Sequence, residues 1–156
     1  MYAYLLEDSI KLYRPLSPKD EKWRGSKCEA KVYNLHTLPA KGQTLILTSS
    51  VKDSMVLNEL GFAAICFGSE GINLSAEFVA ELKQRFEYIF IFMDTDVAGL
   101  KANLRLSQQF ECPYLTIPEK YHCKDIADIS RKYGLNKTYK ILKKRICRQF
   151  HNQIPF

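Results

Sequence analysis

The sequence predicts an α/β fold in which a central parallel sheet is flanked by helices. Two observations support this prediction. Short apolar runs alternate with segments of helical periodicity from residue 43 to residue 134, and the run at residues 88–93 is apolar throughout. Strands that alternate with helices at short intervals are typical of parallel sheets, and an unbroken apolar strand is covered on both faces. Functional side chains in such folds gather at the carboxyl ends of the strands.

The chain divides into three segments in this interpretation. Residues 1–42 form an N-terminal β-hairpin, with its turn at Asp8 and Ser9, and an extended lead-in that is rich in Pro, Lys, Gly and Ser and has little regular structure. Residues 43–134 form the α/β domain, and residues 135–156 form a basic C-terminal helix. Because the chain has only 156 residues, of which 46% are hydrophobic, we expect one globular domain.

The elements of the α/β domain follow from periodicity and capping. Strands are expected at residues 44–48, 63–67, 88–93 and 115–117. Helices are expected at residues 51–60, 75–86, 97–110 and 135–151. Phe78, Leu82 and Phe86 recur at helical spacing and predict the buried stripe of the second helix, for which Ser75 is a good N-cap. The last helix is expected to pack through Tyr139, Leu142, Ile146 and Phe150.

The net charge of +6 belongs to the C-terminal segment. After Asp128 there are eight basic side chains and no acidic one, whereas the preceding residues have a net charge of −2. On the last helix, the basic side chains form a stripe that we expect to contact nucleic acid, and a solvated outer face is the alternative. The stripe consists of Lys137, Lys140, Lys144 and Arg148. Trp23 beside Arg24 is a second candidate contact with single-stranded nucleic acid, and a tryptophan that anchors a loop is its alternative.

The sequence also excludes several classes of protein. No apolar run approaches the length of a membrane span and the N-terminus lacks a signal-like pattern, so we expect a cytoplasmic protein without membrane contact. The five cysteines are scattered without a Cys-x-x-Cys pair, so neither a disulfide framework nor a zinc site is expected.

Two acidic clusters follow predicted strands. Asp94 and Asp96 come directly after the apolar strand, where two carboxylates can hold Mg²⁺, although Asp96 would equally cap the next helix. Asp125 and Asp128 follow the last predicted strand at the start of a helix. Asp125 could share a metal site with Asp94 and Asp96, and the alternative is that the pair caps the helix and stabilises its first turn. Ser49 and Ser50 end the first strand, and Glu70 follows the second.

These clusters resemble the motifs of the TOPRIM domain, which topoisomerases, bacterial-type primases and some nucleases share. The segments Asp94-Thr95-Asp96-Val97-Ala98-Gly99 and Lys124-Asp125-Ile126-Ala127-Asp128 match its later motifs in order and spacing. The chain is most similar to DnaG-like primases encoded by phages and mobile elements. The resemblance implies a Rossmann-like TOPRIM sheet and a site for Mg²⁺ or Mn²⁺, with two metal ions as an option. Its implied metal ligands are Asp94, Asp96 and Asp125.

The resemblance further implies metal-dependent nucleotidyl transfer that makes RNA primers on single-stranded DNA during DNA replication. The implied partners are the DNA template, ribonucleotides and a replicative helicase or another replisome protein, in the host cytoplasm if the chain is phage-encoded. Implied phosphate contacts are Ser49, Ser50, Lys52, Lys101 and Lys124. Full primases of this type resemble a three-part protein with a zinc-binding module, so a fragment or a minimal version is expected.

One departure from the family bears on catalysis. Where TOPRIM domains have a glutamate followed by glycine, this sequence has Ser49 and Ser50, while Lys52 and Asp53 stay in register. A serine cannot act as a general acid or base at neutral pH. Three hypotheses remain: Glu70 joins Asp94 and Asp96 as the catalytic carboxylates, a partner completes the chemistry, or the chain is a degenerate binding module. A TOPRIM nuclease is a variant of the enzyme hypothesis. A receiver-like phosphoacceptor ranks last, because no acidic pair ends the first strand.

Overall fold

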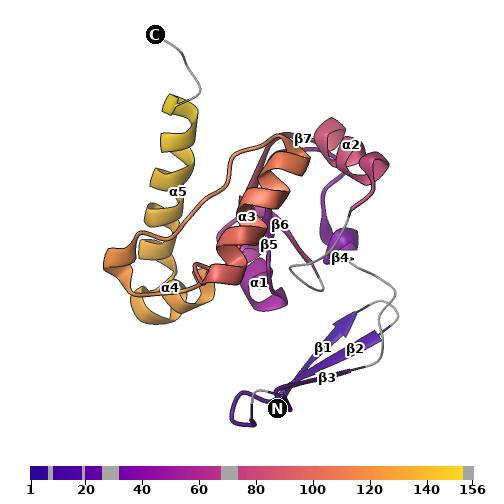
Figure 1. Ribbon diagram of the computed structural model, residues 1–156, viewed down its shortest axis with the longest axis vertical. Coiled ribbons are helices and arrows are strands. Elements are labelled where there is room, and N and C mark those ends of the chain that lie inside the picture. The colour runs from indigo at the N-terminus through magenta and orange to yellow at the C-terminus, as the bar shows by residue number, and fades with distance from the viewer. Residues whose placement is uncertain (7–8, 19, 26–31, 68–73, 153–156) are drawn as a thin grey trace.

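A four-stranded sheet and a three-stranded sheet form the framework of the computed structural model, which describes residues 1–6, 9–18, 20–25, 32–67 and 74–152 (Figure 1). The strands are β1 (Tyr2–Leu6), β2 (Ser9–Tyr13), β3 (Trp23–Gly25), β4 (Val32–Tyr33), β5 (Gly42–Thr48), β6 (Ala63–Phe67) and β7 (Phe86–Phe92). The helices are α1 (Val51–Glu59), α2 (Ala76–Arg85), α3 (Val97–Phe110), α4 (Ile126–Tyr133) and α5 (Leu135–Asn152), with short 3₁₀ turns η1 (Leu35–Thr37) and η2 (Glu119–Tyr121).

The central sheet has the order β4-β6-β5-β7 and confirms the predicted parallel core. β5 pairs parallel with β6 and with β7, so that Leu47 lies beside both Ile65 and Ile91. Only β4 runs antiparallel, against β6. Since β5, β6 and β7 point the same way, their carboxyl ends meet at one edge of the sheet.

Helices cover both faces of this sheet. On one face, α2 and α3 bury Leu82 and Leu106 against alternate residues of β5 and β7. On the other face, α1, α4 and α5 pack against the residues of opposite parity, among them Ile46 and Phe90. The strands are therefore apolar on both sides, which explains why their sequences read as continuous apolar runs.

Side-chain caps determine where the helices of this sheet begin. Ser50, Ser75, Asp96 and Asp125 each accept a hydrogen bond from the backbone N–H three residues ahead. Such caps satisfy N–H groups that have no partner inside the helix. The predicted cap at Ser75 and the predicted span of α3 are thus confirmed.

Two expectations about the α/β domain are wrong. The helix predicted at residues 75–86 ends at Arg85, because Phe86 already begins β7, and the buried side chains of α2 are Val79 and Leu82 rather than Phe86. The strand predicted at residues 115–117 is a single parallel bridge between Ile91 and Tyr114. Among the described residues, the chain there pairs with β7 only at Ile91, through the carbonyl of Pro113 and the N–H of Leu115.

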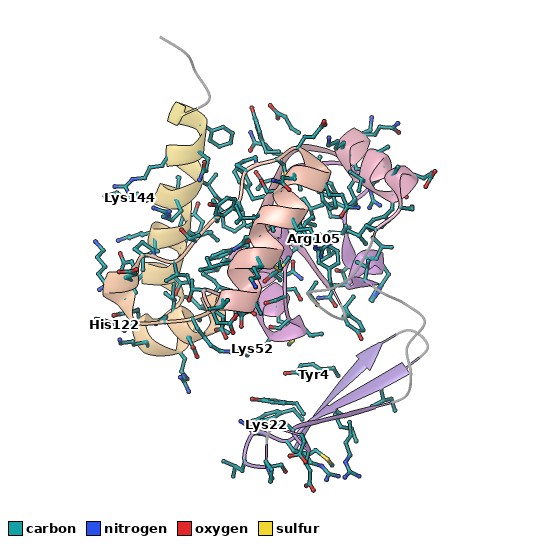
Figure 2. All side chains as sticks on the ribbon, in the orientation of Figure 1. Tyr4, Lys22, Lys52, Arg105, His122 and Lys144 are labelled. Atoms are coloured by element: carbon teal, nitrogen blue, oxygen red, sulfur yellow. The ribbon has the colours of Figure 1, made fainter. Side chains whose placement is uncertain are left out.

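The N-terminal segment contains more structure than predicted. The antiparallel pair β1–β2 confirms the hairpin, but Ser9 already lies in β2, and residues 7 and 8 lie outside the described residues. β3, β4 and η1 all fall within the segment expected to be irregular. Tyr4 of β1 packs against Val51 and Cys66, so this small sheet lies at the end of the central sheet where α1 begins (Figures 1 and 2).

The C-terminal helix α5 packs on the central sheet through part of the predicted stripe. Leu142 and Ile146 are buried, and the ring of Phe150 makes edge contacts with Tyr88 and Phe90. Tyr139 remains 39% exposed. Within the described ranges, neither α5 nor any other helix has the length and apolar character needed to cross a membrane.

We expect Leu142→Ala to destabilise the fold by about 2–4 kcal/mol, because a fully buried leucine leaves a cavity on truncation. Urea denaturation followed by circular dichroism measures this loss. Leu104→Ala is the matched control, since Leu104 is 52% exposed on α3 and its truncation should change the free energy of unfolding by only about 0.5 kcal/mol. Equal effects of the two substitutions would contradict the packing of α5 against the sheet.

Candidate functional site

Three aspartates from three separate segments that lead into helices meet at the carboxyl edge of the central sheet. Asp53 lies in the first turn of α1, Asp94 follows β7, and Asp125 is the N-cap of α4. One carboxylate oxygen of each lies within 4.8 Å of an oxygen of the other two. The parallel topology brings Asp53 and Asp94 together, because β5 and β7 end at the same edge of the sheet. Asp125 reaches this edge through the backbone hydrogen bond between Thr95 and Lys124.

Asp53 is the most deeply buried member of this cluster. Its side chain is hydrogen-bonded to Ser50 Oγ, the cap of α1, and accepts a hydrogen bond of 3.1 Å from the backbone N–H of Ala127 in α4. Burial raises the pKa of Asp53 from 3.8 to about 7, and the negative charge of Asp125 contributes to the increase. Asp53 therefore joins two helices and at the same time bears a charge that the fold accommodates poorly.

Asp94 is held at the opening of the cluster. Ser49 Oγ donates to its Oδ1 at 2.6 Å, and Lys124 Nζ lies 3.2 Å from its Oδ2. The close approach of α3 to the Asp94 backbone requires Gly99, since a Cβ atom there would lie 2.2 Å from the Asp94 carbonyl oxygen. Asp96 is not part of the group of three, and its Oδ1 accepts the N–H of Gly99 as the cap of α3.

Asp125 is aligned with Asp94 by a direct tie between their loops. The N–H of Thr95 donates to the carbonyl of Lys124 at 2.9 Å, and its hydroxyl donates to the same oxygen at 3.2 Å. Asp125 Oδ1 accepts the N–H of Asp128, while its Oδ2 accepts from Lys52 Nζ at 3.0 Å. Asp125 thus confirms the capping interpretation of this motif, and its place in the acidic cluster is consistent with the metal interpretation, which stays a prediction.

Two lysines balance the negative charge at the solvent side. Burial alone would lower the pKa of Lys52, but its ion pair with Asp125 and the charge of Asp53 outweigh burial and raise the pKa. The same balance, with Asp94 as the main partner, raises the pKa of Lys124. Their side chains stay 43% and 59% exposed, which leaves both ammonium groups within reach of a ligand.

The donor set fits a hard divalent cation. Three carboxylates supply only oxygen atoms, which Mg²⁺ and Mn²⁺ prefer, and the poorly compensated charge of Asp53 is what a cation would neutralise. The arrangement is therefore consistent with a metal centre whose ligands are Asp53, Asp94 and Asp125.

The structure distributes the predicted site residues unevenly. Asp94, Asp125, Ser49, Lys52 and Lys124 come together, Ser50 caps α1, and Asp96 lies outside the group of three. Lys101 is exposed on α3, and Arg24 is exposed on β3, whereas nothing is described of the Trp23 side chain. The basic stripe of α5 is exposed throughout: Lys137, Lys140, Lys144 and Arg148. Glu70 lies outside the described residues, so its proposed recruitment stays a hypothesis.

Asp53 is the residue that sequence reasoning did not assign to the metal. The available signal was its place in register with the Lys-Asp pair that TOPRIM domains have early in this helix. From the sequence, Asp53 stands out only for staying in register, and its backbone N–H proves to be the donor of the hydrogen bond that the cap Ser50 accepts.

Comparison with solved structures identifies the fold. The E. coli primase catalytic core superposes with a TM-score of 0.68 at 16% identity, over 94% of this chain and 51% of that one. The chain has the fold of a primase catalytic core. The DnaG primase catalytic domain bound to single-stranded DNA gives a TM-score of 0.64 at 15% identity, over 94% of this chain and 52% of that one.

A third similar structure is the primase fragment of the bacteriophage T7 primase-helicase protein, with a TM-score of 0.61 at 18% identity, over 88% of this chain and 56% of that one. The chain thus spans about half the length of each of these primase structures. No protein-family model and no curated relative matches the chain.

The raised pKa of Asp53 predicts a pH dependence of stability. From about pH 4 to pH 7 the folded state keeps a proton that the unfolded state loses, so the free energy of unfolding falls as the pH rises. Asp53→Asn should abolish this fall and make the variant more stable than the wild type at pH 8, by at most about 4 kcal/mol. Urea denaturation at pH 4.5 and pH 8 with a chelator present measures the difference.

Asp128→Asn is the control for this experiment, because Asp128 lies on the same helix as Asp125 and pairs with the exposed Arg131. It should keep the pH dependence of the wild type. If the stability of Asp53→Asn still fell with rising pH as that of the wild type does, the ionisation of Asp53 would not be what destabilises the folded state. The raised pKa inferred for Asp53 would then be wrong.

Proposed function

We propose that the chain is a primase-like nucleotidyltransferase that joins ribonucleotides into primers on single-stranded DNA. The observation that supports this most directly is the meeting of Asp53, Asp94 and Asp125 at the carboxyl edge of a sheet with the fold of a primase catalytic core. One of the similar structures is a DnaG catalytic domain bound to single-stranded DNA. We therefore propose single-stranded DNA as the template here.

The three aspartates are proposed to hold Mg²⁺ or Mn²⁺. Bound there, a divalent cation would neutralise triphosphate charge and help to activate the attacking hydroxyl. Ser49, through its hydrogen bond to Asp94 Oδ1, keeps that carboxylate oriented toward the cluster. Asp96 fixes the start of α3 and with it the loop that presents Asp94.

Lys52 and Lys124 are the best-placed phosphate contacts. Each is paired with a carboxylate of the cluster, and each is half exposed. Neutralisation of Asp125 and Asp94 by a cation would release the two ammonium groups toward the phosphates of an incoming nucleotide. The exposed stripe of α5, which includes Lys140, Lys144 and Arg148, is proposed to hold the nucleic-acid backbone.

The same comparison supports the proposal of a replisome partner. One similar structure is a fragment of a protein named a primase-helicase, so we propose a replicative helicase as a partner of this chain.

A second candidate function is a binding module that has lost its catalysis. The observation in its favour is the neutral hydroxyl of Ser49, which donates to Asp94 at the position where the TOPRIM resemblance would lead one to expect a glutamate. A module of this kind would bind nucleic acid or a replisome protein without joining nucleotides.

Asp94→Asn should weaken Mn²⁺ binding at least about 100-fold, since replacing even an outer partner of a metal ligand commonly costs 10–100-fold in affinity. Isothermal titration calorimetry measures the affinity, and extension of labelled ribonucleotides on single-stranded DNA measures primer synthesis, which should fall in parallel. Asp128→Asn is the control and should leave both unchanged. Mn²⁺ binding that survives Asp94→Asn and Asp53→Asn would exclude the proposed metal centre.

Substitutions of Ser49 separate the two candidate functions. We expect the wild type to make primers with Mn²⁺, and Ser49→Glu, which adds a carboxylate beside Asp94, to raise the rate. Ser49→Gln is the control for size and should bring no increase. Primers made only by Ser49→Glu would favour the degenerate module, and the absence of product from all three proteins would contradict nucleotidyl transfer.

A further inference from the structure

Three lysines gather around a pair of tyrosines on the surface formed by η2, α4 and the start of α5. The rings of Tyr121 and Tyr133 meet edge to face with centroids 5.7 Å apart. Lys132 Nζ and Lys137 Nζ lie 5.2 and 4.7 Å from the centroid of the Tyr133 ring, and Lys120 Nζ lies 5.3 Å from that of Tyr121. These five residues are called the lysine–tyrosine patch.

The backbone around Gly134 holds this patch together. Gly134 has a φ of +77°, a conformation that L side chains rarely adopt, and it turns the chain sharply from α4 into α5. The turn brings Lys137 back over Tyr133. Lys132 is further restrained, because its Nζ donates to the carbonyl of Tyr121 at 3.0 Å.

The lysines of the patch are available to an anion. All three are exposed, and within the described ranges no ion pair joins any of them to a carboxylate. Contacts with an aromatic face stabilise an exposed ammonium group only weakly, and they narrow its range of positions. Three ammonium groups with restricted positions lose less entropy when they bind phosphates than three free lysines would.

The patch is continuous with the acidic cluster. Tyr121 leads through His122 and Cys123 to Lys124, whose side chain pairs with Asp94 and whose carbonyl accepts the N–H of Thr95. Figure 2 shows His122 at the corner where this connection meets α4, below Lys144 on the outer side of α5. A chain of phosphates that follows the patch would therefore be led toward the loops that present Asp94 and Asp125.

We propose that the lysine–tyrosine patch binds the backbone of single-stranded nucleic acid, and that one base displaces an ammonium group from a face of the Tyr133 ring and stacks there. The ligand class follows from two features together: ammonium groups without a carboxylate partner attract any polyanion, whereas partly exposed aromatic rings among them select one that has flat bases. The proposal deepens the proposed function, on which it rests for the identity of the strand as template or primer. The carboxylates of an acidic protein segment would pair with the lysines but would not need the tyrosine rings, so nucleic acid accounts for more of the patch.

The test is the binding of fluorescent oligo(dT) at several salt concentrations. Lys132→Gln/Lys137→Gln should weaken binding about ten-fold at low salt. The slope of the logarithm of the binding constant against the logarithm of the salt concentration should become shallower by about 1.4, because each of the two lost phosphate contacts contributes about 0.7 to the slope for a single strand. The matched control Lys41→Gln/Lys83→Gln removes the same charge from exposed lysines elsewhere and should leave the slope unchanged. Equal effects of the two double variants would overturn the proposal.

A second pair of variants tests the stacked base. Tyr133→Leu keeps an apolar side chain under the lysines and should weaken oligo(dT) binding about five-fold or more, whereas Tyr133→Phe keeps the ring and should bind as the wild type does. Circular dichroism checks that both remain folded. If polyglutamate of equal charge displaces oligo(dT) from the wild type as well as unlabelled oligo(dT) does, the patch serves an acidic protein instead.

These readouts distinguish the patch from the proposed catalysis. If Asp94→Asn stops primer synthesis but the patch variants bind normally, the patch proposal fails alone. If the wild type makes no primers and the patch variants still lose binding with the predicted salt slope, the nucleotidyltransferase proposal fails alone.

Discussion

The hydrogen bond from the Ala127 N–H to the carboxylate of Asp53 is the contact on which the candidate site depends. It joins the first turn of α1 to the first turn of α4 and places Asp53 among residues from both. It acts against the repulsion between Asp53 and Asp125, which is costly because both carboxylates are nearly fully buried. The fold thus holds two like charges together at a cost in stability, an arrangement typical of functional sites.

Ion pairs between lysines and carboxylates offset part of the negative charge of the cluster. Lys52 and Lys124 approach from solvent and pair with Asp125 and Asp94. Since both lysines are half exposed, the proposed function would have them exchange these carboxylates for phosphate. Binding of a cation and binding of an anionic nucleotide would then favour each other. The cation would draw the carboxylates away from the lysines, and the phosphates would draw the lysines away from the carboxylates.

Local chemistry was predictable from the sequence, and contacts between distant residues were not. The caps at Ser50, Ser75 and Asp96 involve residues three positions apart, so their patterns are visible in the chain. Phe86 fits the last turn of a helix as well as the start of a strand, and only its pairing with Gly42 decides between them. The burial of Asp53 depends on Ala127, 74 residues away, and no local pattern reports it. For Asp125 a capping role does not exclude the metal role, since one oxygen caps α4 and the other, paired with Lys52, is left to the cluster.

The distance along the chain between the members of the cluster determines when the site can form. The contacts of Asp53 with Ala127 and of Lys52 with Asp125 span 74 and 73 residues, and the tie from Thr95 to Lys124 closes a loop within that span. Closing loops of this length is entropically costly until the intervening strands and helices have been packed. The acidic cluster is therefore expected to assemble among the last parts of the fold. During synthesis, a cation that requires all three aspartates would have no complete site until α4 has left the ribosome.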